Sequence, residues 1–333
     1  MKFKIQNKKK ILFIGFGDNL IRLIKKCLDN PMIVVTGVIC RNDINNNLKN
    51  NFNRDIKKLN IKNYKIKKIN SETVIKKLSL LNLDLICCWG YNELLNKNFI
   101  SLAKKKVINL HPGLLPFGRG SGAINGEILN NSNYLGSTVH VINEKFDLGQ
   151  IIGQIKTKFS GLEYYDEITN KLKKNHVDFF YKSIVNYLFK NKKLKKITQF
   201  GRYYPKLAPY DDYIDWEKKS NFIIKKVRSR SPNLLSKTIV IKTNKIIYVK
   251  ELNFSKVKDY KFISGQIIDN CKIKGSLIKT ADNALWIKKI SYNGKNFFIP
   301  RFKIGTTFLS LNFSSILEYI NQIKKINSKI YKK

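Results

Sequence analysis

Long apolar stretches are missing from this chain of 333 residues. None approaches the roughly 20 residues that a membrane-spanning helix requires, and residues 1–10 are basic without the apolar core and cleavage site of a signal peptide. The five cysteines are an odd number and include no C-x-x-C pair, so they indicate reduced thiols rather than a disulfide framework or a zinc site. We therefore expect a cytoplasmic protein that holds no metal and has no membrane partner.

Acidic residues are also scarce, with 23 Asp and Glu against 64 Lys and Arg and a formal net charge of +41. Such an excess would suit a nucleic-acid binder, because lysines that neutralise phosphates release counterions. The lysines, however, occur in pairs along the whole chain, at 25–26, 173–174 and 324–325 among others. This distribution favours a compositional background over a dedicated RNA surface.

Apolar runs alternate with helical patterns over the first half of the chain. Residues 11–17, 33–39 and 83–88 are typical of buried parallel strands, and 64–69 is expected to be a further strand. A long amphipathic helix is expected at 163–189, with His176 facing solvent. The order predicts an α/β fold with a mostly parallel open sheet and helices on both faces. The glycines at 15 and 17 lack the third glycine of a dinucleotide-binding loop and predict only a tight turn.

The stretch 107–150 concentrates the groups that can carry chemistry. An apolar strand ends in Asn109-Leu110-His111, and the period of two in a strand puts the amide and the imidazole on one face. Prolines and glycines then force an open loop, and Asp147 follows a second strand that contains His140. Asn can stabilise an oxyanion and His can exchange a proton near neutral pH, so the three groups suit acyl transfer to an amine.

The motifs N-L-H-P-G-L-L-P-F-G-R-G at 109–120, G-S-T-V-H at 136–140 and D-L-G at 147–149 together resemble the folate-dependent formyltransferase family. Its members formylate glycinamide ribonucleotide, methionyl-tRNA or amino sugars. The chain departs from the usual pattern at Gly113, where a serine is common, at Leu148, and in lacking a proline after the R-G pair.

The resemblance implies roles for particular residues. The matching Asn, His and Asp of the family are its catalytic set, which implies that role for Asn109, His111 and Asp147. A G-Y loop after the strand at 83–88 and the loop after His111 would line the folate pocket. The residues expected to bind the cofactor are Trp89, Gly90, Tyr91, Leu114, Leu115 and Arg119.

The second half of the chain shows a different pattern. A lysine-rich run at 190–196 is the best linker candidate, and G-R-Y-Y-P-K-L…I-D-W at 201–216 again resembles the family. Short strands at 246–249, 265–268, 276–278 and 284–287 predict a small β-barrel, which the resemblance implies to be similar to an OB-fold. We expect a catalytic domain at 1–190, a connecting segment at 191–235 and an OB-like domain at 236–333.

These expectations describe an enzyme that moves a formyl group from 10-formyltetrahydrofolate to a primary amine. A nucleotide-linked amino sugar is the first choice of acceptor, because the basic, glycine-rich insertion that methionyl-tRNA formyltransferases carry after the second strand is replaced here by R-N-D-I-N-N-N-L. Methionyl-tRNA is the alternative acceptor, supported by the net charge. A non-catalytic RNA-binding protein is a distant third, since it leaves the three catalytic candidates without a purpose. The oligomeric state is left open, a homodimer included.

Overall fold

The computed structural model describes residues 8–190, 194–198, 201–231, 234–257 and 261–310. The chain forms two compact units. The first takes in the chain up to Ile124 together with 133–159 and 168–206, and the second takes in 125–132, 160–167 and the chain from Leu207. The expected domain boundaries stay a prediction, and 191–193 and 311–333 lie outside the described residues.

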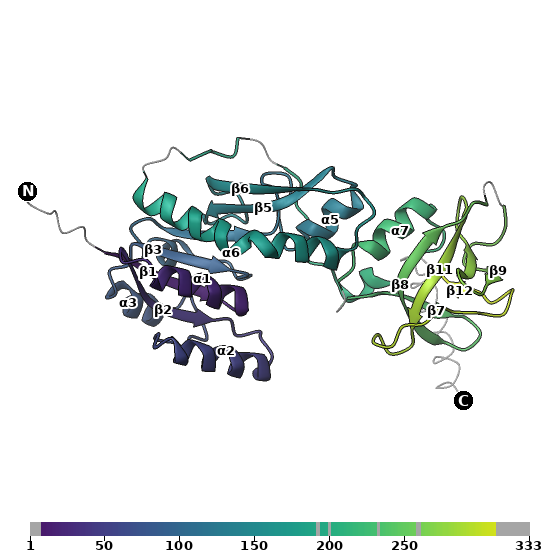
Figure 1. The fold of residues 1–333 in the computed structure, drawn as a ribbon, viewed down its shortest axis with the longest axis horizontal. Helices are drawn as coiled ribbons and strands as arrows, with labels where there is room; N and C mark the ends of the chain where they lie inside the picture. The colour runs from purple at the N-terminus through teal and green to yellow at the C-terminus, as the bar shows by residue number, and fades with distance from the viewer. Residues whose placement is uncertain (1–7, 191–193, 199–200, 232–233, 258–260, 311–333) are drawn as a thin grey trace, which may run out of the picture. The chain divides into compact units, whose positions relative to one another are not determined.

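The first unit contains a six-stranded sheet in the order β2-β1-β3-β4-β5-β6 (Figure 1). The pairs β1–β2, β1–β3 and β3–β4 are parallel, while β4–β5 and β5–β6 are antiparallel. The expected mostly parallel sheet is therefore confirmed, with an antiparallel hairpin at the edge that follows His111. The strands are β1 (Lys9–Gly15), β2 (Ile33–Cys40), β3 (Leu85–Trp89), β4 (Val107–His111), β5 (Tyr134–Val141) and β6 (Ile151–Lys158).

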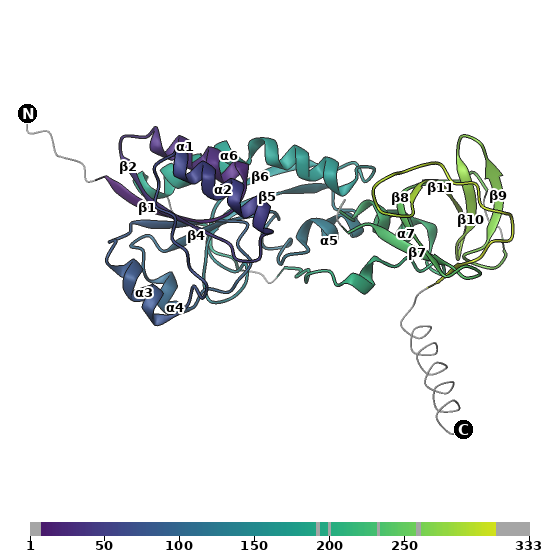
Figure 2. The ribbon, with the colours of Figure 1, turned by 90° about the horizontal axis from the view of Figure 1, so that it is seen from below.

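Helices cover both faces of this sheet, as Figure 2 shows. One face packs its apolar residues against α1 (Asp18–Leu28), α2 (Asn46–Lys58) and α6 (Tyr165–Phe189). The other packs against α3 (Glu72–Ser79) and α4 (Lys97–Ile100), and α5 (Ala123–Leu129) follows the loop after β4. Continuous burial of β1 and β3 explains why these strands read as unbroken apolar runs rather than as alternating ones.

Two local expectations are wrong. His176 is buried rather than exposed, because its Nε2 lies 2.7 Å from the Ser137 hydroxyl and its ring packs edge-on against Trp89. Residues 64–69 form no strand, although Tyr64 and Ile66 are buried. Pairing with β2 is limited to a bridge between Asn63 and Val38, where the Tyr64 N–H donates to the Val38 carbonyl at 2.8 Å. Beyond it the side-chain amide of Asn42 donates to the backbone carbonyls of Ile66 and Lys67.

The second unit is built on a curled antiparallel sheet in the order β12-β7-β8-β11-β10-β9. Its two edges meet, since Ile267 donates to the Thr306 carbonyl and Phe308 donates to the Gly265 carbonyl, both at 2.8 Å. The elements of this unit are η1 (Pro209–Asp212), α7 (Ser220–Arg228), β7 (Ser236–Val240), β8 (Lys245–Phe254), β9 (Ile267–Cys271), β10 (Gly275–Lys279), β11 (Ala284–Ser291) and β12 (Phe308–Leu309).

Trp216 anchors the core of the second unit. Its ring is fully buried, and Nε1 donates a hydrogen bond of 2.9 Å to the Thr238 hydroxyl. Ile214 and the apolar face of α7 pack into the same core. Trp216 is therefore a packing residue of this core. Among the helices that the structure describes, none is both long and apolar enough to cross a bilayer.

Candidate active site

Asn109 and His111 lie on β4, directly opposite two polar residues of β5. The register pairs Asn109 with His140 and His111 with Thr138. Side chains of paired residues in an antiparallel ladder share one face, so all four point to the same side of the sheet. The strand thus presents an amide and an imidazole together, as the sequence predicts, and its neighbour adds a second imidazole.

His111 is held between two hydrogen-bond acceptors. Its Nδ1 lies 3.6 Å from Asp147 Oδ1, and its Nε2 lies 2.5 Å from the carbonyl oxygen of Gly118. The side chain is almost completely buried. Each ring nitrogen of His111 thus faces an oxygen that can accept a hydrogen bond. A ring held in this way can act as a hydrogen-bond donor.

The loop that reaches His111 depends on Gly113. A Cβ atom at this position would lie 2.1 Å from the Gly118 oxygen and 2.6 Å from His111 Nε2. The Thr138 hydroxyl fixes the same loop, since it donates to the Gly113 carbonyl at 2.6 Å and accepts from the Leu115 N–H at 3.1 Å. The glycine that departs from the usual family pattern is therefore what allows the Gly118 carbonyl to approach His111.

Asp147 is placed by a turn of unusual backbone geometry. Its φ is 54°, in the left-handed region, and a Cβ at Gly149 would lie 1.5 Å from the Val141 oxygen. The Gly120 N–H donates to Asp147 Oδ2 at 2.8 Å, while Oδ1 lies 3.5 Å from His140 Nε2. Aspartate tolerates the left-handed region better than most residues, and the D-L-G turn directs its carboxylate toward both histidines.

Asn109 has one unmet hydrogen-bonding group. Its Nδ2 lies 3.4 Å from His140 Nε2, whereas its Oδ1 is buried and has no hydrogen-bond partner in the structure. An orphaned buried acceptor costs about 1–3 kcal/mol. A ligand that brings an N–H or O–H to this oxygen would recover that free energy.

A small cavity of about 60 Å³ adjoins these groups. Asn109, His140 and Asp147 line one side of it. Burial, together with the neighbouring Glu93 carboxylate, raises the pKa of the Tyr91 hydroxyl at the cavity wall. The loops after β3 and after β5 provide the remaining lining residues, namely Tyr91, Glu93, Leu94, Leu95, Ile142, Asn143, Lys145 and Phe146.

Most of these lining residues are absent from the set expected from the sequence. Their positions give a signal in hindsight, because they follow the carboxyl end of β3 and immediately precede Asp147. Of the expected cofactor residues, only Tyr91 lines the cavity. Trp89 instead packs against His176 and Phe180, with ring centroids 6.1 and 5.9 Å apart. The Gly90 carbonyl accepts a hydrogen bond from Arg41.

The remaining expected residues lie on the loop after His111. Leu114 is half-buried, and Leu115 is buried with its carbonyl accepting from Gln154 at 2.8 Å. The Arg119 guanidinium lies 5.5 Å from the Tyr203 ring and donates to the Phe146 carbonyl at 3.3 Å. Arg119 thereby ties this loop to the one that carries Asp147.

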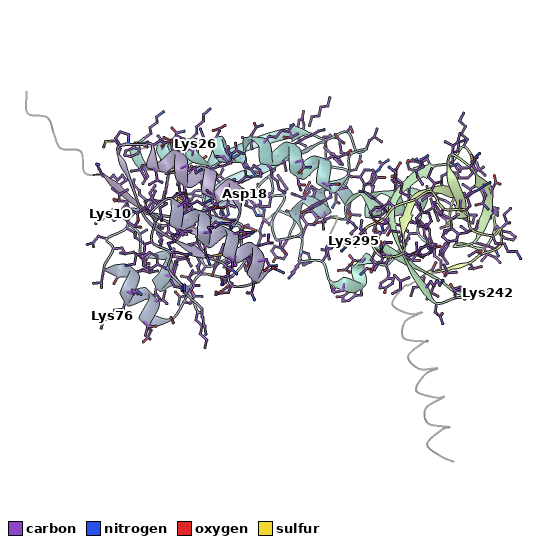
Figure 3. All side chains as sticks on the ribbon, turned by 60° about the horizontal axis from the view of Figure 1, so that its bottom comes forward. Lys10, Asp18, Lys26, Lys76, Lys242 and Lys295 are labelled. Carbon is purple, nitrogen blue, oxygen red and sulfur yellow. The ribbon has the colours of Figure 1, made fainter. Side chains whose placement is uncertain are left out.

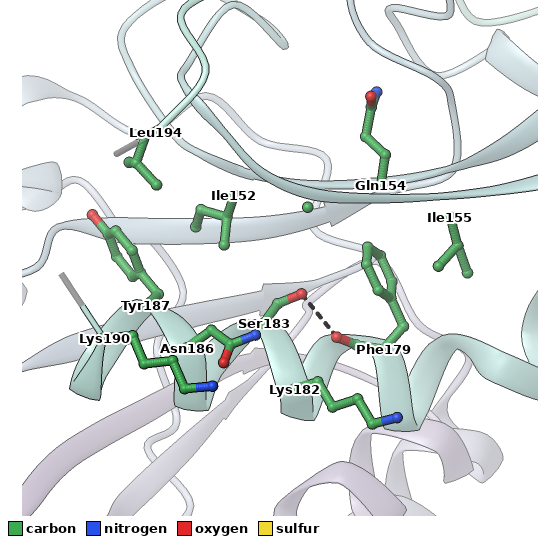
Figure 4. Close-up of a pocket in the computed structure, with 11 residues that line it drawn as sticks. Ile152, Gln154, Ile155, Phe179, Lys182, Ser183, Asn186, Tyr187, Lys190 and Leu194 are labelled. Carbon is green, nitrogen blue, oxygen red and sulfur yellow. Dashed lines mark hydrogen bonds between the residues drawn. The ribbon is translucent and has the colours of Figure 1, made fainter. Parts of the chain in front are cut away.

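A larger cavity lies away from the catalytic candidates. It measures about 290 Å³ and lies between β6 and α6, as Figure 4 shows. Lys182 and Asn186 line it from the helix and Lys190 from the residue that follows the helix, and the Ser183 hydroxyl donates to the Phe179 carbonyl at 2.8 Å. None of Asn109, His111 and Asp147 borders it. We therefore take the smaller cavity as the candidate active site.

Comparison with known families agrees with this geometry. A family model described as formyl transferase matches residues 9–184, and one described as formyl transferase, C-terminal domain, matches residues 206–300. The chain belongs to the formyl transferase family. Among curated formyltransferases it is 29% identical over 239 residues to the methionyl-tRNA formyltransferase of Fusobacterium nucleatum, covering 71% of this chain and 76% of that protein. It is 28% identical over 260 residues to the methionyl-tRNA formyltransferase of Finegoldia magna, covering 75% and 83%.

Solved formyltransferase structures share the fold. The 4-N formyltransferase from Francisella tularensis superposes with a TM-score of 0.61 at 22% identity, covering 73% of this chain and 97% of that chain. WlaRD, a sugar 3N-formyl transferase, superposes with a TM-score of 0.62 at 17% identity, covering 84% and 98%. HypX from Aquifex aeolicus, solved with tetrahydrofolic acid, superposes with a TM-score of 0.56 at 17% identity. The match covers 84% of the present chain and 43% of HypX.

The protein is thus a folate-dependent formyltransferase, and its formyl donor is 10-formyltetrahydrofolate. The lining residues suit the formyl end of such a donor, because the cavity of about 60 Å³ combines apolar walls with the orphaned Asn109 oxygen. When bound, the folate supplies the formyl carbonyl that is to be transferred. Among the described residues, no group of three or more His, Cys, Asp or Glu side chains is arranged to hold a metal ion.

Proposed function

We propose that Asn109, His111 and Asp147 catalyse the transfer of the formyl group to a primary amine. The observation that carries this proposal is their convergence. His111 Nδ1 lies 3.6 Å from Asp147 Oδ1, and Asn109 shares its face of β4 and lines the adjoining cavity with Asp147. Folate binding by Trp89, Gly90, Leu114, Leu115 and Arg119 stays a prediction, since none of the five lines this cavity.

Each residue has a distinct role in this scheme. An N–H of Asn109 and the protonated ring of His111 donate to the formyl oxygen as negative charge develops there. Asp147 stabilises the charged ring of His111, since Asp147 is itself fixed by the Gly120 N–H at 2.8 Å. His111 Nε2 lies against the Gly118 carbonyl. This contact must break before Nε2 can donate a hydrogen bond to the formyl oxygen, so binding of the folate would displace this part of the loop.

We propose methionyl-tRNA as the amine acceptor. The support is that the curated relatives described above are methionyl-tRNA formyltransferases and align over 71 to 75% of this chain. The family match at 206–300 extends the likeness into the second unit.

The second unit carries a surface chemistry that suits RNA. Lysine ammonium groups with no role elsewhere in the account lie over aromatic rings at two places on the barrel. Such pairs combine a cation for phosphate with a ring face for a base. They are Lys250 over Phe297 at 4.9 Å and Lys274 over Trp286 at 5.6 Å.

Positive charge also lies beyond the carboxyl end of β2, where the glycine-rich insertion is missing. Lys49, Lys65 and Lys67 line a cavity of about 270 Å³ there. Elsewhere the lysines are spread over many elements, as Figure 3 shows for Lys26 on α1 and Lys76 on α3. The lysines of the barrel and those beyond β2 are therefore the ones to test for tRNA binding, with the lysines on other elements as controls.

A nucleotide-linked amino sugar is the second candidate acceptor. The absence of the insertion after β2 favours it, and solved structures with this fold include sugar N-formyltransferases. The two acceptors differ in the number of phosphates that the protein would neutralise. A nucleotide sugar has two, whereas a tRNA offers many.

A competition assay separates them. The protein receives 10-formyltetrahydrofolate with methionyl initiator tRNA and an amino-sugar nucleotide in one tube, and mass spectrometry identifies which product gains the formyl group. We expect formyl-methionyl-tRNA. Raising salt from about 50 to 200 mM should weaken tRNA binding by on the order of a thousandfold if six phosphates are contacted.

Lysine variants supply the matched control. The double variant Lys250→Ala, Lys274→Ala should weaken tRNA binding and reduce the salt slope, while Lys76→Ala, Lys77→Ala on α3 should not. Formylation of the sugar alone, with a shallow salt dependence in every variant, would overturn the choice of acceptor and leave the catalytic assignment standing.

A further inference from the structure

His140 has no role in the scheme above, although it touches two of its members. It lies on β5 directly opposite Asn109 and is only 2% exposed. Its Nε2 lies 3.4 Å from Asn109 Nδ2 and 3.5 Å from Asp147 Oδ1. A polar ring in such a place needs hydrogen-bond partners, and the partners it has define its protonation.

The backbone determines which nitrogen of His140 carries the proton. Nδ1 lies 3.1 Å from the carbonyl oxygen of Val141, which can only accept, so Nδ1 donates. Burial, assisted by the neighbouring His111, lowers the pKa of His140 to about 4, against the opposing effect of Asp147. The ring is consequently neutral near pH 7, and Nε2 is an unprotonated acceptor.

An acceptor at Nε2 constrains the amide of Asn109. If the amide were rotated by half a turn, Asn109 Oδ1 would face Nε2 and two acceptors would oppose each other. With Nδ2 toward His140, one N–H is bonded and Oδ1 is turned away, where it is buried and unpartnered. Asn109 then offers its remaining N–H and an acceptor oxygen to a ligand.

We propose that His140 is a positioning residue that fixes the orientation of the Asn109 amide for formyl transfer. In this orientation the free N–H of Asn109 donates to the formyl oxygen, and Oδ1 accepts an N–H of the attacking amine. No bond is made or broken at His140. Because it acts through Asn109, its contribution disappears when Asn109 is removed.

A double-mutant cycle tests this dependence. His140→Met removes the acceptor at similar length, and His140→Gln returns an oxygen near the position of Nε2. We expect His140→Met to lower kcat about tenfold, the size of one lost hydrogen bond, with little change in the KM for 10-formyltetrahydrofolate. His140→Gln should recover most of the rate. In an Asn109→Ala background, His140→Met should cause no further loss.

His176 provides the control for buried-histidine effects. It is also buried, its pKa is also lowered to about 4, and it packs on the opposite face of the sheet against Trp89. Its replacement by Met should leave the effect of Asn109→Ala unchanged. A further tenfold loss from His140→Met in the Asn109→Ala background would overturn the proposal, as would full activity of His140→Met itself.

A spectroscopic measurement keeps the proposal falsifiable if His140→Met folds poorly. Ring ¹⁵N chemical shifts of the labelled wild-type protein near pH 7 distinguish a protonated nitrogen from a bare one. We expect Nδ1 of His140 to be protonated and Nε2 to be bare. A proton on Nε2 would contradict the proposal, because His140 could then no longer accept from Asn109.

Discussion

The two units treat buried polar groups in different ways. In the first, the buried His111 and the largely buried Asp147 gather with Asn109 beside a cavity, and the Asn109 oxygen has no partner. In the second, the buried Asp212 Oδ1 also has no hydrogen-bond partner, but Asp212 faces opposite charges, 3.7 Å from Arg230 and 3.4 Å from Lys237. Those charges compensate one another and border none of the cavities described above.

The difference between the two units shows which kind of buried polar group indicates a catalytic site. Perturbed groups occur in both units, since burial lowers the pKa of Lys226 in the second to about 8. Lys226 donates to the Tyr213 carbonyl and lies among aspartates, as expected of a structural ion-pair network. An unmet acceptor on a cavity wall, rather than a shifted pKa alone, distinguishes the catalytic cluster.

The largest expected effect is the loss of turnover when a member of the catalytic cluster in the first unit is replaced. Asn109→Ala and His111→Ala should each lower kcat by about a hundredfold to a thousandfold, because each removes a donor to the developing oxyanion. Asn30→Ala is the matched control, because its amide donates to the Tyr181 hydroxyl at 3.0 Å and Asn30 borders none of the three cavities described above. Near wild-type turnover in both catalytic variants, with normal thermal unfolding, would make the assignment wrong.

An intermediate effect is expected from the loop that contacts His111. Gly113→Ala puts a Cβ within 2.1 Å of the Gly118 oxygen, a backbone atom that only a loop movement can relieve. We expect kcat/KM to fall about tenfold through loss of order around His111. Gly153→Ala is the control, since its Cβ would approach nothing closer than Phe179 at 3.3 Å. Equal activity of the two variants would show that the Gly118 contact is dispensable.

The smallest expected effect concerns stability against pH. Burial lowers the pKa of His140 and His176 from 6.5 to about 4, so between these pH values the histidines are protonated in the unfolded chain and neutral in the folded one. Their contribution to the free energy of unfolding is fully present above pH 6.5 and is lost as the pH falls toward 4. At pH 5.5 the loss is about 1 kcal/mol per histidine. Urea unfolding at pH 7.5 and 5.5 measures it.

A single variant isolates one of the two histidines. His176→Gln keeps a partner for the Ser137 hydroxyl and removes one titrating ring, so the difference between the two pH values should shrink by about half. An unchanged difference would mean that these rings do not govern the pH dependence.

The sequence predicts the parts of this molecule that rest on local pattern. Apolar runs identified β1 and β3, and the period of two put Asn109 and His111 on one face. Contacts made across the fold were beyond such reasoning. His176 sits between lysines at 173, 174 and 182 and looks exposed, yet Ser137 on a distant strand buries it.

The cavity lining shows the same limit. Ile142 and Phe146 belong to the loop before Asp147, and Leu95 belongs to the loop after β3. They meet only because the loop after β3 and the loop after the antiparallel strand β5 both reach the face of the sheet that carries Asn109 and His140. The closed β-barrel likewise depends on hydrogen bonds between 265–267 and 306–308, which no short motif encodes.

A single-turnover comparison of two aspartate variants tests the central claim most directly. Enzyme loaded with formyl-labelled 10-formyltetrahydrofolate is mixed with methionyl-tRNA and the amino-sugar nucleotide, and the label is followed into product. Asp147→Asn should bind the donor but transfer the label at least about a hundredfold more slowly, because the charge that supports His111 is gone. Asp212→Asn should lose stability, by about 3 kcal/mol for a broken buried pair, while its folded fraction transfers at the wild-type rate. Wild-type transfer by Asp147→Asn, or a slow chemical step in folded Asp212→Asn, would contradict the account.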